Sequence, residues 1–411
     1  MSGSNDNALR ANGDRLWRSL MDMAEVGGLP GGGSNRVALT DEDGAGQELF
    51  GEWAVAAGCA LARDRVGNLF ATRPGTDPAR PAVLVGSHLD TQPGGGRFDG
   101  TVGVLAGLEI VHTLNDLGVE TAAPVVVVSW SNEEGARFPL PMTGSAVFAG
   151  LLAAEEAEGQ RALDGPTYGE ELERLGLAGN DRGPEDVGSY FELHIEQSTT
   201  LERSGTDIGI VERGQGVRAL EVTLTGASSH AGTTAMNERR DALLTAARVV
   251  EAANRLGHTT GTLVTVGRLD VSPNSRAVVP GTVTLVVDVR HRESERLTVA
   301  VEAVRTEIGQ IAAADGIGVE IDQVLEIPVV TFDEGCGDSV RRACEALDLS
   351  FTSLVSGAGH DAMSIARIAP AALVFIPCRD GVSHHPDEYS SPAQVANGCN
   401  ALLHAVLDRA G

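Results

Sequence analysis

The stretch Ala82-Val83-Leu84-Val85-Gly86-Ser87-His88-Leu89-Asp90 decides which fold and which chemistry this chain is expected to have. Its four leading apolar residues are typical of a buried strand, which would deliver His88 and Asp90 into a turn. The glycine-rich segment Gly94–Gly100 follows at once and adds Asp99. Imidazole and carboxylate groups at the end of a strand are suitable ligands for a divalent metal. Taken alone, the segment also fits a buried core histidine with two aspartates in a turn.

The residues that follow alternate between helix and strand patterns. Apolar residues recur at helical spacing between 103 and 114, and the run 124–130 is a continuous β-branched stretch, typical of a strand buried on both faces. That strand ends just before Glu133 and Glu134, and a third expected strand, 189–196, carries His194. Strand, helix and strand in this order predict an α/β domain with a mostly parallel sheet flanked by helices. Potential ligands then gather where such sheets bind their substrates.

A different pattern begins after about residue 211. The segments 218–225, 262–269 and 282–289 alternate as strands, 241–256 and 293–314 have helical spacing, and 319–325 closes as a strand. The order β-α-β-β-α-β is that of a ferredoxin-like α+β unit. We therefore expect one domain made of residues 1–211 and 329–411, with a second domain, 212–328, inserted into it.

Composition narrows the possible partners. The net charge is −26, from 31 basic and 57 acidic residues, which argues against nucleic acids and anionic membranes as partners. Every basic residue is an arginine. A Schiff-base lysine, a pyridoxal-phosphate lysine and a Walker lysine are therefore excluded.

Cysteine usage and the N-terminal sequence predict the compartment. The five cysteines are widely spaced, odd in number and contain no CxxC pair, which favours a reducing environment. The first residues are polar and lack the apolar core of a secretory signal. No apolar run reaches the roughly 20 residues that span a bilayer. We expect a cytoplasmic protein.

The acidic and histidine clusters together predict a pair of metals. Two divalent ions about 3.5–4 Å apart, bridged by a carboxylate and a water, would use one histidine each, with another carboxylate completing the second ion. Adjacent glutamates are unremarkable on a solvated loop. At the end of a buried strand, one could bind a metal while the other stays free as a general base. The groups available are His88, Asp90, Asp99, Glu133, Glu134, His194, His384 and His385.

Several motifs resemble one enzyme family. They are Gly86-Ser-His-Leu-Asp-Thr-Gln-Pro, Gly-Gly-Arg-Phe-Asp99-Gly, Asn-Glu133-Glu134-Gly-Ala-Arg-Phe, Glu192-Leu-His194-Ile-Glu-Gln197, Ser229-His230-Ala-Gly-Thr-Thr, Ser356-Gly-Ala-Gly-His360-Asp361-Ala and Gly381-Val-Ser-His384. In order and type they resemble the hydantoinase/carbamoylase branch of the M20 metallopeptidase superfamily. That branch contains N-carbamoyl-L-amino acid hydrolases, allantoate amidohydrolases and β-ureidopropionases.

The resemblance implies a site with two divalent ions, for which zinc, manganese, cobalt and nickel are all suitable. It assigns His88 and His194 to one ion, Glu134 and His384 to the other, and Asp99 as the bridge. Asp90 would orient His88 through its second ring nitrogen, and Glu133 would be the general base. His384 is preferred to His385 because the family pattern places a glutamate four residues later, here Glu388.

The resemblance also assigns roles to the inserted domain, which would be a lid and a dimer interface in a homodimer. His230 would reach the active site of the partner subunit and stabilise the oxyanion of the intermediate. Arg290 would hold the substrate carboxylate in bidentate fashion. Further candidates for substrate contacts are Gln197, Gln215, Asn274 and His360.

Two departures from the family pattern bear on the substrate. Ala277 stands where a second asparagine usually helps to bind it, and Ala235 stands where a proline is usual. Neither position is a metal ligand. The expected small-molecule substrate is an N-carbamoyl-L-amino acid or related ureido acid, cleaved at its carbamoyl C–N bond to release ammonia and carbon dioxide. The alternatives are an allantoate amidohydrolase, a β-ureidopropionase, an aminoacylase or peptidase, and a non-catalytic scaffold.

Overall fold

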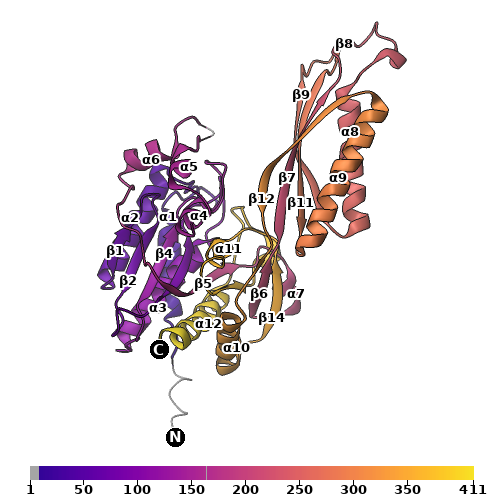
Figure 1. Ribbon diagram of the computed structural model, residues 1–411. Coiled ribbons are helices and arrows are strands. Elements are labelled where there is room, and N and C mark those ends of the chain that lie inside the picture. Colours follow the sequence, from indigo (N-terminus) through magenta and orange to yellow (C-terminus); the bar gives the residue numbers. More distant parts are fainter. Residues whose placement is uncertain (1–8, 163) are drawn as a thin grey trace. The chain divides into compact units, whose positions relative to one another are not determined.

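The computed structural model describes residues 9–162 and 164–411 (Figure 1). The chain forms two compact units. The first holds the described residues up to Glu212 together with Thr331–Gly411, and the second is Arg213–Val330. We expected the chain to pass between domains at 211–212 and 328–329, and it passes between these units at 212–213 and 330–331.

The first unit is built on a nine-stranded sheet whose centre is parallel. The four central strands, in spatial order, are β4 (Val125–Trp130), β3 (Ala82–His88), β5 (Val187–Ile195) and β15 (Ala371–Ile376). Antiparallel strands extend it, with β2 (Leu69–Arg73) and β1 (Ala60–Arg63) on one side and β6 (Ile208–Gly214) on the other. Beyond β6 lie β13 (Val330–Thr331) and β14 (Phe351–Ser356). The predicted α/β class with a mostly parallel central sheet is confirmed.

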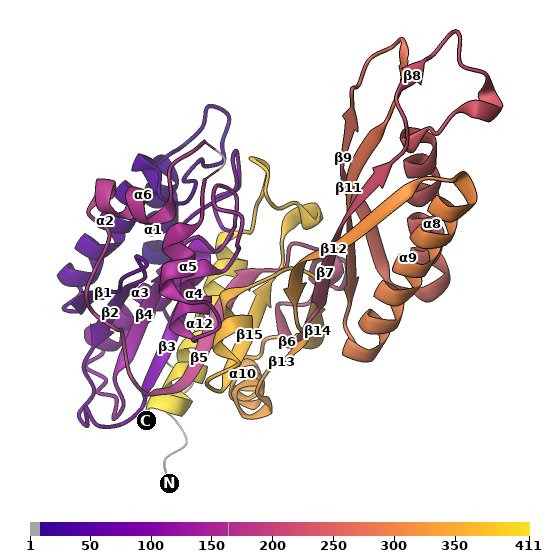
Figure 2. The same cartoon turned by 45° about the horizontal axis from the view of Figure 1, so that its top comes forward.

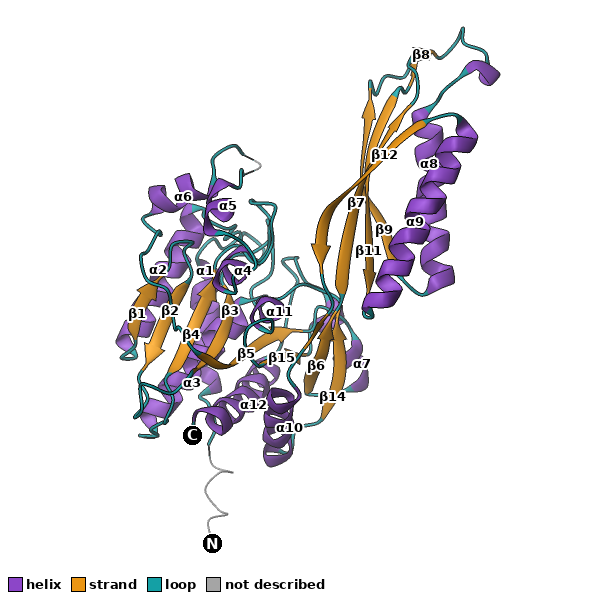
Figure 3. Cartoon of the chain, in the orientation of Figure 1, coloured by secondary structure: helices purple, strands orange, loops and turns teal. Residues whose placement is uncertain are grey.

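Helices cover the central strands and bury them. Every residue of β3 and β4 is buried, as expected for parallel strands with both faces covered. The helices that share the main apolar core with the sheet are α1 (Gly13–Glu25), α2 (Asp41–Ala56), α3 (Thr101–Asp116), α10 (Glu334–Leu347) and α12 (Pro392–Ala410) (Figure 3). Shorter helices complete the unit, namely α4 (Thr143–Phe148), α5 (Ala154–Gly159), α6 (Tyr168–Leu175), α7 (Thr200–Ser204) and α11 (Asp361–Ile365).

The second unit is an antiparallel sheet with two helices on one face. Its strands lie in the order β12 (Gly318–Ile327), β7 (Gly216–Thr225), β11 (Thr282–His291) and β9 (Leu263–Ser272). Helices α8 (Ala242–Thr260) and α9 (Ser294–Asp315) lie side by side and share a core with the alternate buried residues of β7 and β11 (Figure 2). A two-stranded ribbon, β8 (Ser229–His230) with β10 (Val278–Val279), belongs to the same unit.

Element ends differ from the sequence prediction in places. The pattern of residues 41–60 predicts one helix, but α2 stops at Ala56, because Gly58 adopts a positive φ of 84° and the chain then enters the edge strand β1. Within the described residues, no helix combines the length and apolar character needed to cross a bilayer.

Helix α3 offers a direct test of this packing. Its residue Leu114 is fully buried, whereas Leu117, one turn later, is 53% exposed. Leu114→Ala should lower the free energy of unfolding by about 2–5 kcal/mol, because it leaves a cavity in the core. The matched variant Leu117→Ala should change it by about 0.5 kcal/mol or less. Urea unfolding of both variants measures the difference, and equal losses would contradict the packing of α3.

Candidate active site

The carboxyl ends of three neighbouring strands bring polar groups together. His88 is the last residue of β3, and His194 lies one residue before the end of β5. Strand β4 ends at Trp130, and the chain then turns at Asn132, whose φ is 52°, to present Glu133 and Glu134. Because β3 lies between β4 and β5, these side chains start from one edge of the sheet.

One ligand group consists of His88, Asp99 and His194, all buried, with one ligand atom from each lying within 4.8 Å of the others. Asp99 Oδ1 lies 3.0 Å from His194 Nε2 and 3.4 Å from His88 Nε2. Each histidine uses its Nδ1–H elsewhere, on the carbonyl of Asp90 or of Ile195, both at 2.9 Å. When such a ring is neutral, the lone pair of its Nε2 therefore faces the Asp99 carboxylate.

That arrangement needs a positive charge. A lone pair on Nε2 and a carboxylate oxygen 3.0 Å apart repel each other unless a proton or a cation lies between them. The backbone N–H of Gly100 also donates to His194 Nε2 at 3.1 Å, which supports the assignment of a lone pair there. The donor set is thus suitable for a divalent ion with nitrogen and oxygen ligands.

A second ligand group consists of Asp99, Glu134 and His384. His384 Nε2 lies 3.4 Å from Asp99 Oδ2 and 3.4 Å from Glu134 Oε2. Gln92 holds the Glu134 carboxylate by donating from its backbone N–H at 3.1 Å and its side-chain amide at 2.9 Å. Asp99 is common to both groups, with one oxygen facing each.

The charges of these groups are strongly coupled. Burial by itself would raise the pKa of Asp99, but the neighbouring histidines, His194 first, hold it well below its usual value. The hydrogen bond to Asp99 raises the pKa of His384 to about 9. Burial and the Asp99 charge raise the pKa of Glu134 to about 7. His384 and Glu134 therefore bind protons more readily than usual, in positions where a bound cation could replace the protons.

Glu133 lies beside the first group without belonging to either. Its carboxylate is buried, and Oε2 lies 3.5 Å from His88 Nε2. Burial, with the charges of Asp361 and Glu134, raises the pKa of Glu133 well above its usual value. A carboxylate placed in this way can accept and return a proton.

Asp90 contacts the site in two ways. The contact that orients His88 comes from the Asp90 backbone carbonyl, while the carboxylate Oδ1 lies 3.7 Å from His88 Nδ1. The Asp90 carboxylate instead accepts the backbone N–H of Glu133 at 3.2 Å and that of Glu134 at 3.1 Å. Its main structural role is therefore to hold the turn that carries the two glutamates.

Two expected substrate contacts of the first unit lie close to the ligand groups. Gln197, whose φ is 57°, donates from Nε2 to Asp99 Oδ2 at 2.7 Å. Its carbonyl Oε1 is buried and has no hydrogen-bond partner in the described part of the chain. His360 is buried against His194, with ring centroids 4.5 Å apart, and its Nε2 lies 3.0 Å from Ser356 Oγ.

The remaining expected residues lie in the second unit. His230 is exposed on β8, and its Nδ1 accepts the backbone N–H of Gly232 at 2.9 Å. Arg290, on β11, donates to both carboxylate oxygens of Asp288 at 2.8 and 3.3 Å. Gln215 lies in the link between β6 and β7, and Asn274 is exposed with a φ of 51°.

Sequence reasoning missed several supporting residues. Gln92 holds Glu134, while Ser383 and Glu388 contact Asp99. Glu388 was noticed only as part of the pattern that selected His384. Glu388 is far from Asp99 along the chain, and local sequence patterns do not predict contacts between residues so far apart.

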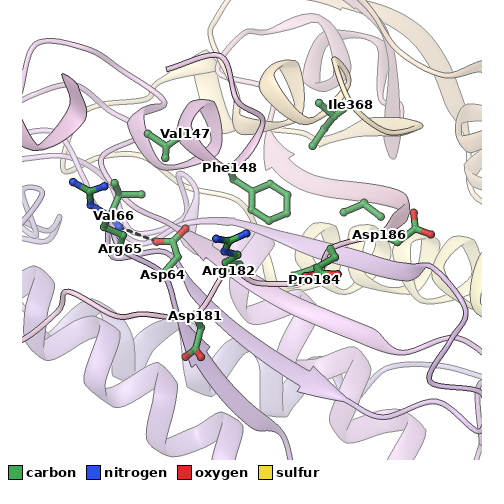
Figure 4. A pocket seen from close by; sticks show the side chains of 12 residues that line it. Asp64, Arg65, Val66, Val147, Phe148, Asp181, Arg182, Pro184, Asp186 and Ile368 are labelled. Carbon is green, nitrogen blue, oxygen red and sulfur yellow. Dashed lines mark hydrogen bonds between the residues drawn. The ribbon is translucent and has the colours of Figure 1, made fainter. Parts of the chain in front are cut away.

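A cavity elsewhere in the first unit contains none of the expected residues. It has a volume of about 580 Å³ and is lined by Val147, Phe148 and Ile368 with the charged side chains of Asp64 and Arg182, among others (Figure 4). Its acidic and basic groups are mixed, and none belongs to a ligand group. The chemistry of the unit is therefore assigned to the cluster around Asp99.

Comparisons with known proteins show which family this chain is similar to. Residues 84–408 match the family described as Peptidase family M20/M25/M40. The chain is 45% identical over 404 residues to an N-carbamoyl-L-amino-acid amidohydrolase of Rhizobium meliloti, covering 98% of this chain and 97% of that protein. It is 33% identical to an allantoate amidohydrolase of Escherichia coli strain K12, covering 94% and 95%. A hydantoinase/carbamoylase-family amidase of Burkholderia vietnamiensis superposes with a TM-score of 0.92 at 45% identity, covering 98% of both chains.

The raised pKa of His384 leads to a prediction. With a pKa of about 9, this side chain carries a proton at pH 7 in the metal-free protein, and a metal ligand must lose it. Divalent-ion binding at pH 7 should therefore release protons and should strengthen as the pH rises towards 9. Calorimetric titrations in buffers of different ionisation enthalpy measure the released protons. Binding without proton release would contradict the role of His384 as a ligand.

Proposed function

We propose that this chain, which belongs to peptidase family M20/M25/M40, is a metal-dependent amidohydrolase that cleaves the carbamoyl C–N bond of an N-carbamoyl-L-amino acid. The reaction adds water across that bond and releases the L-amino acid, ammonia and carbon dioxide. The observation that carries the proposal is Asp99, whose two oxygens face two separate groups of histidine and carboxylate ligands.

Five residues would hold two divalent ions. His88 and His194 would bind one, Glu134 and His384 the other, and Asp99 would bridge them. Zinc, manganese, cobalt and nickel all suit these ligands. Such ions supply Lewis acidity towards the substrate carbonyl and lower the pKa of water.

Glu133 would move the proton. It lies within 3.5 Å of His88 but outside both ligand groups, so its carboxylate stays available. It would take a proton from the attacking water and pass it to the leaving nitrogen. Asp90 fixes this base by holding its backbone N–H at 3.2 Å.

The second unit would serve as lid and dimerisation domain of a homodimer. In neutral His230 the proton lies on Nε2, because Nδ1 accepts the N–H of Gly232. That Nε2–H can donate to the oxyanion of the intermediate. Arg290 would release Asp288 and bind the substrate carboxylate in its place. Gln215 and Asn274 are proposed as further substrate contacts from this unit.

Recognition of the ureido group would use Gln197 and His360. The unpartnered Oε1 of Gln197 can accept a hydrogen bond from a ureido N–H. Loss of the second family asparagine at Ala277 removes one polar anchor, so the accepted side chain is expected to differ between this chain and its relatives.

The proposal also includes a cytoplasmic location and no nucleic-acid or membrane partners.

Ammonia release from three substrates tests the function. Metal-reconstituted protein should hydrolyse N-carbamoyl-L-methionine faster than allantoate or N-carbamoyl-β-alanine. The allantoate reaction is the second candidate, because curated relatives at 33–34% identity bear that name. A preference for allantoate would replace the proposed substrate, and no release from any of the three would overturn the proposed function.

Substitution of the proposed base gives a sharper test. Glu133→Gln keeps the size of the side chain but cannot accept the proton, so kcat should fall by about 10²- to 10⁴-fold. The divalent-ion content should stay at the wild-type level, because Glu133 belongs to neither ligand group. Steady-state kinetics and elemental analysis of the same preparation measure both quantities.

The neighbouring variant Glu134→Gln is the matched control. It changes the same chemical group one residue away but removes a proposed ligand, so metal content should fall together with activity. Equal metal loss in both variants would contradict the separate roles of the two glutamates.

A further inference from the structure

We infer that Glu388 and Ser383 are positioning residues for Asp99, the carboxylate shared by the two ligand groups. This inference deepens the proposed function and rests on it. Both residues belong to the segment that carries His384. Their contacts therefore connect one proposed metal ligand with another that lies far away in the sequence.

Glu388 fixes the main chain at Asp99. Its side chain is buried, with only 3% of the residue exposed. The carboxylate Oε1 accepts the backbone N–H of Phe98 at 2.8 Å and that of Asp99 at 3.0 Å. Two charge-assisted hydrogen bonds to consecutive amides set the direction of the peptide from which the Asp99 side chain extends.

Ser383 fixes the Asp99 carboxylate itself. Its Oγ lies 2.7 Å from Asp99 Oδ2 and 3.0 Å from Glu388 Oε2. The single hydroxyl proton serves one acceptor at a time, and the shorter distance assigns it to Asp99. The hydroxyl therefore restrains rotation of the carboxylate that would bridge the ions, as groups behind a metal ligand commonly do.

The glycine-rich segment is shaped around the Glu388 carboxylate. A Cβ atom at Gly96 would lie 2.0 Å from Cδ and Oε1 of Glu388, far inside contact distance. The space beside Gly96 is thus filled by the carboxylate. Because Gly96 has no side chain, the Glu388 carboxylate can reach the two amides.

Glu196 provides a matched control. It is also a buried glutamate, 7% exposed, and its carboxylate accepts the backbone N–H of Thr200 at 3.0 Å and that of Leu201 at 2.8 Å. The hydroxyl of Ser198 donates to it at 2.9 Å. Like Glu388, Glu196 thus accepts two backbone amides, but these amides belong to the start of α7 and to no ligand.

Three substitutions separate positioning from general stability. Glu388→Ala removes the acceptor for both amides, and Ser383→Ala removes only the hydroxyl on Asp99. Glu388→Gln keeps a carbonyl oxygen for the two amides, while its NH₂ group donates to Ser383 and leaves the serine proton on Asp99. Glu388→Gln should therefore rescue what Glu388→Ala loses.

The experiment titrates manganese chloride into chelator-treated protein by calorimetry and measures kcat on the loaded protein. Glu388→Ala and Ser383→Ala should weaken manganese binding by about 10- to 100-fold. Glu388→Gln, and the controls Glu196→Ala and Ser198→Ala, should bind as the wild type does. Urea unfolding of all variants reports stability separately, and Ser383→Ala decides the result where Glu388→Ala does not fold.

The outcomes distinguish this inference from the proposed function. Wild-type binding in Ser383→Ala, or an equal loss in both control variants, overturns the inference. A wild-type chain that binds no manganese overturns the inference together with the proposed ligand set. Selective loss of manganese binding in a protein that cleaves no ureido substrate supports the inference and overturns the function.

Discussion

The structure of the site depends on one buried carboxylate. Asp99 has a histidine on each side, with Oδ1 facing His194 and His88 and Oδ2 facing His384. The chain must turn away directly afterwards: Gly100 has a φ of 61°, and a Cβ there would lie 2.3 Å from the His88 ring. Only glycine permits this close approach. The turn therefore packs the main chain against one ligand while the preceding side chain contacts all three histidines.

The parallel sheet makes this convergence possible. Strands β4, β3 and β5 are adjacent and parallel, so their carboxyl ends meet at one edge although they are distant in sequence. The strands are fully buried at this edge, which removes water and strengthens the interactions among charged groups. The same burial would be costly without balancing cations, because several carboxylates share a small volume. The fold that gathers these carboxylates therefore also creates the need for cations.

Sequence reasoning succeeded where a pattern is local. The β-branched run before Trp130 predicted a buried strand, and the alternation in 218–225 and 282–289 predicted strands that the second unit contains. It failed where the deciding contact is tertiary. The short edge strand β1 carries no strong pattern, because it is half exposed and only four residues long. Sequence reasoning connected Asp90 with His88 but did not indicate that the Asp90 carboxylate also accepts two backbone amides of the turn after β4.

The two adjacent glutamates show how environment, rather than residue type, separates roles. Asp90 accepts one amide with each carboxylate oxygen, so the turn is rigid and the two side chains leave it in different directions. Glu134 extends to Gln92 and His384, where two amide hydrogen bonds hold its oxygens in place. Among the residues that the structure describes, no amide donates to the Glu133 carboxylate, which lies against His88 in a buried position that favours its protonated form. A carboxylate held by donors is suited to permanent ligation, whereas one that gains and loses a proton at little cost is suited to transfer it. The different roles of these neighbours therefore follow from what each side chain meets: Gln92 and His384 for Glu134, and His88 for Glu133.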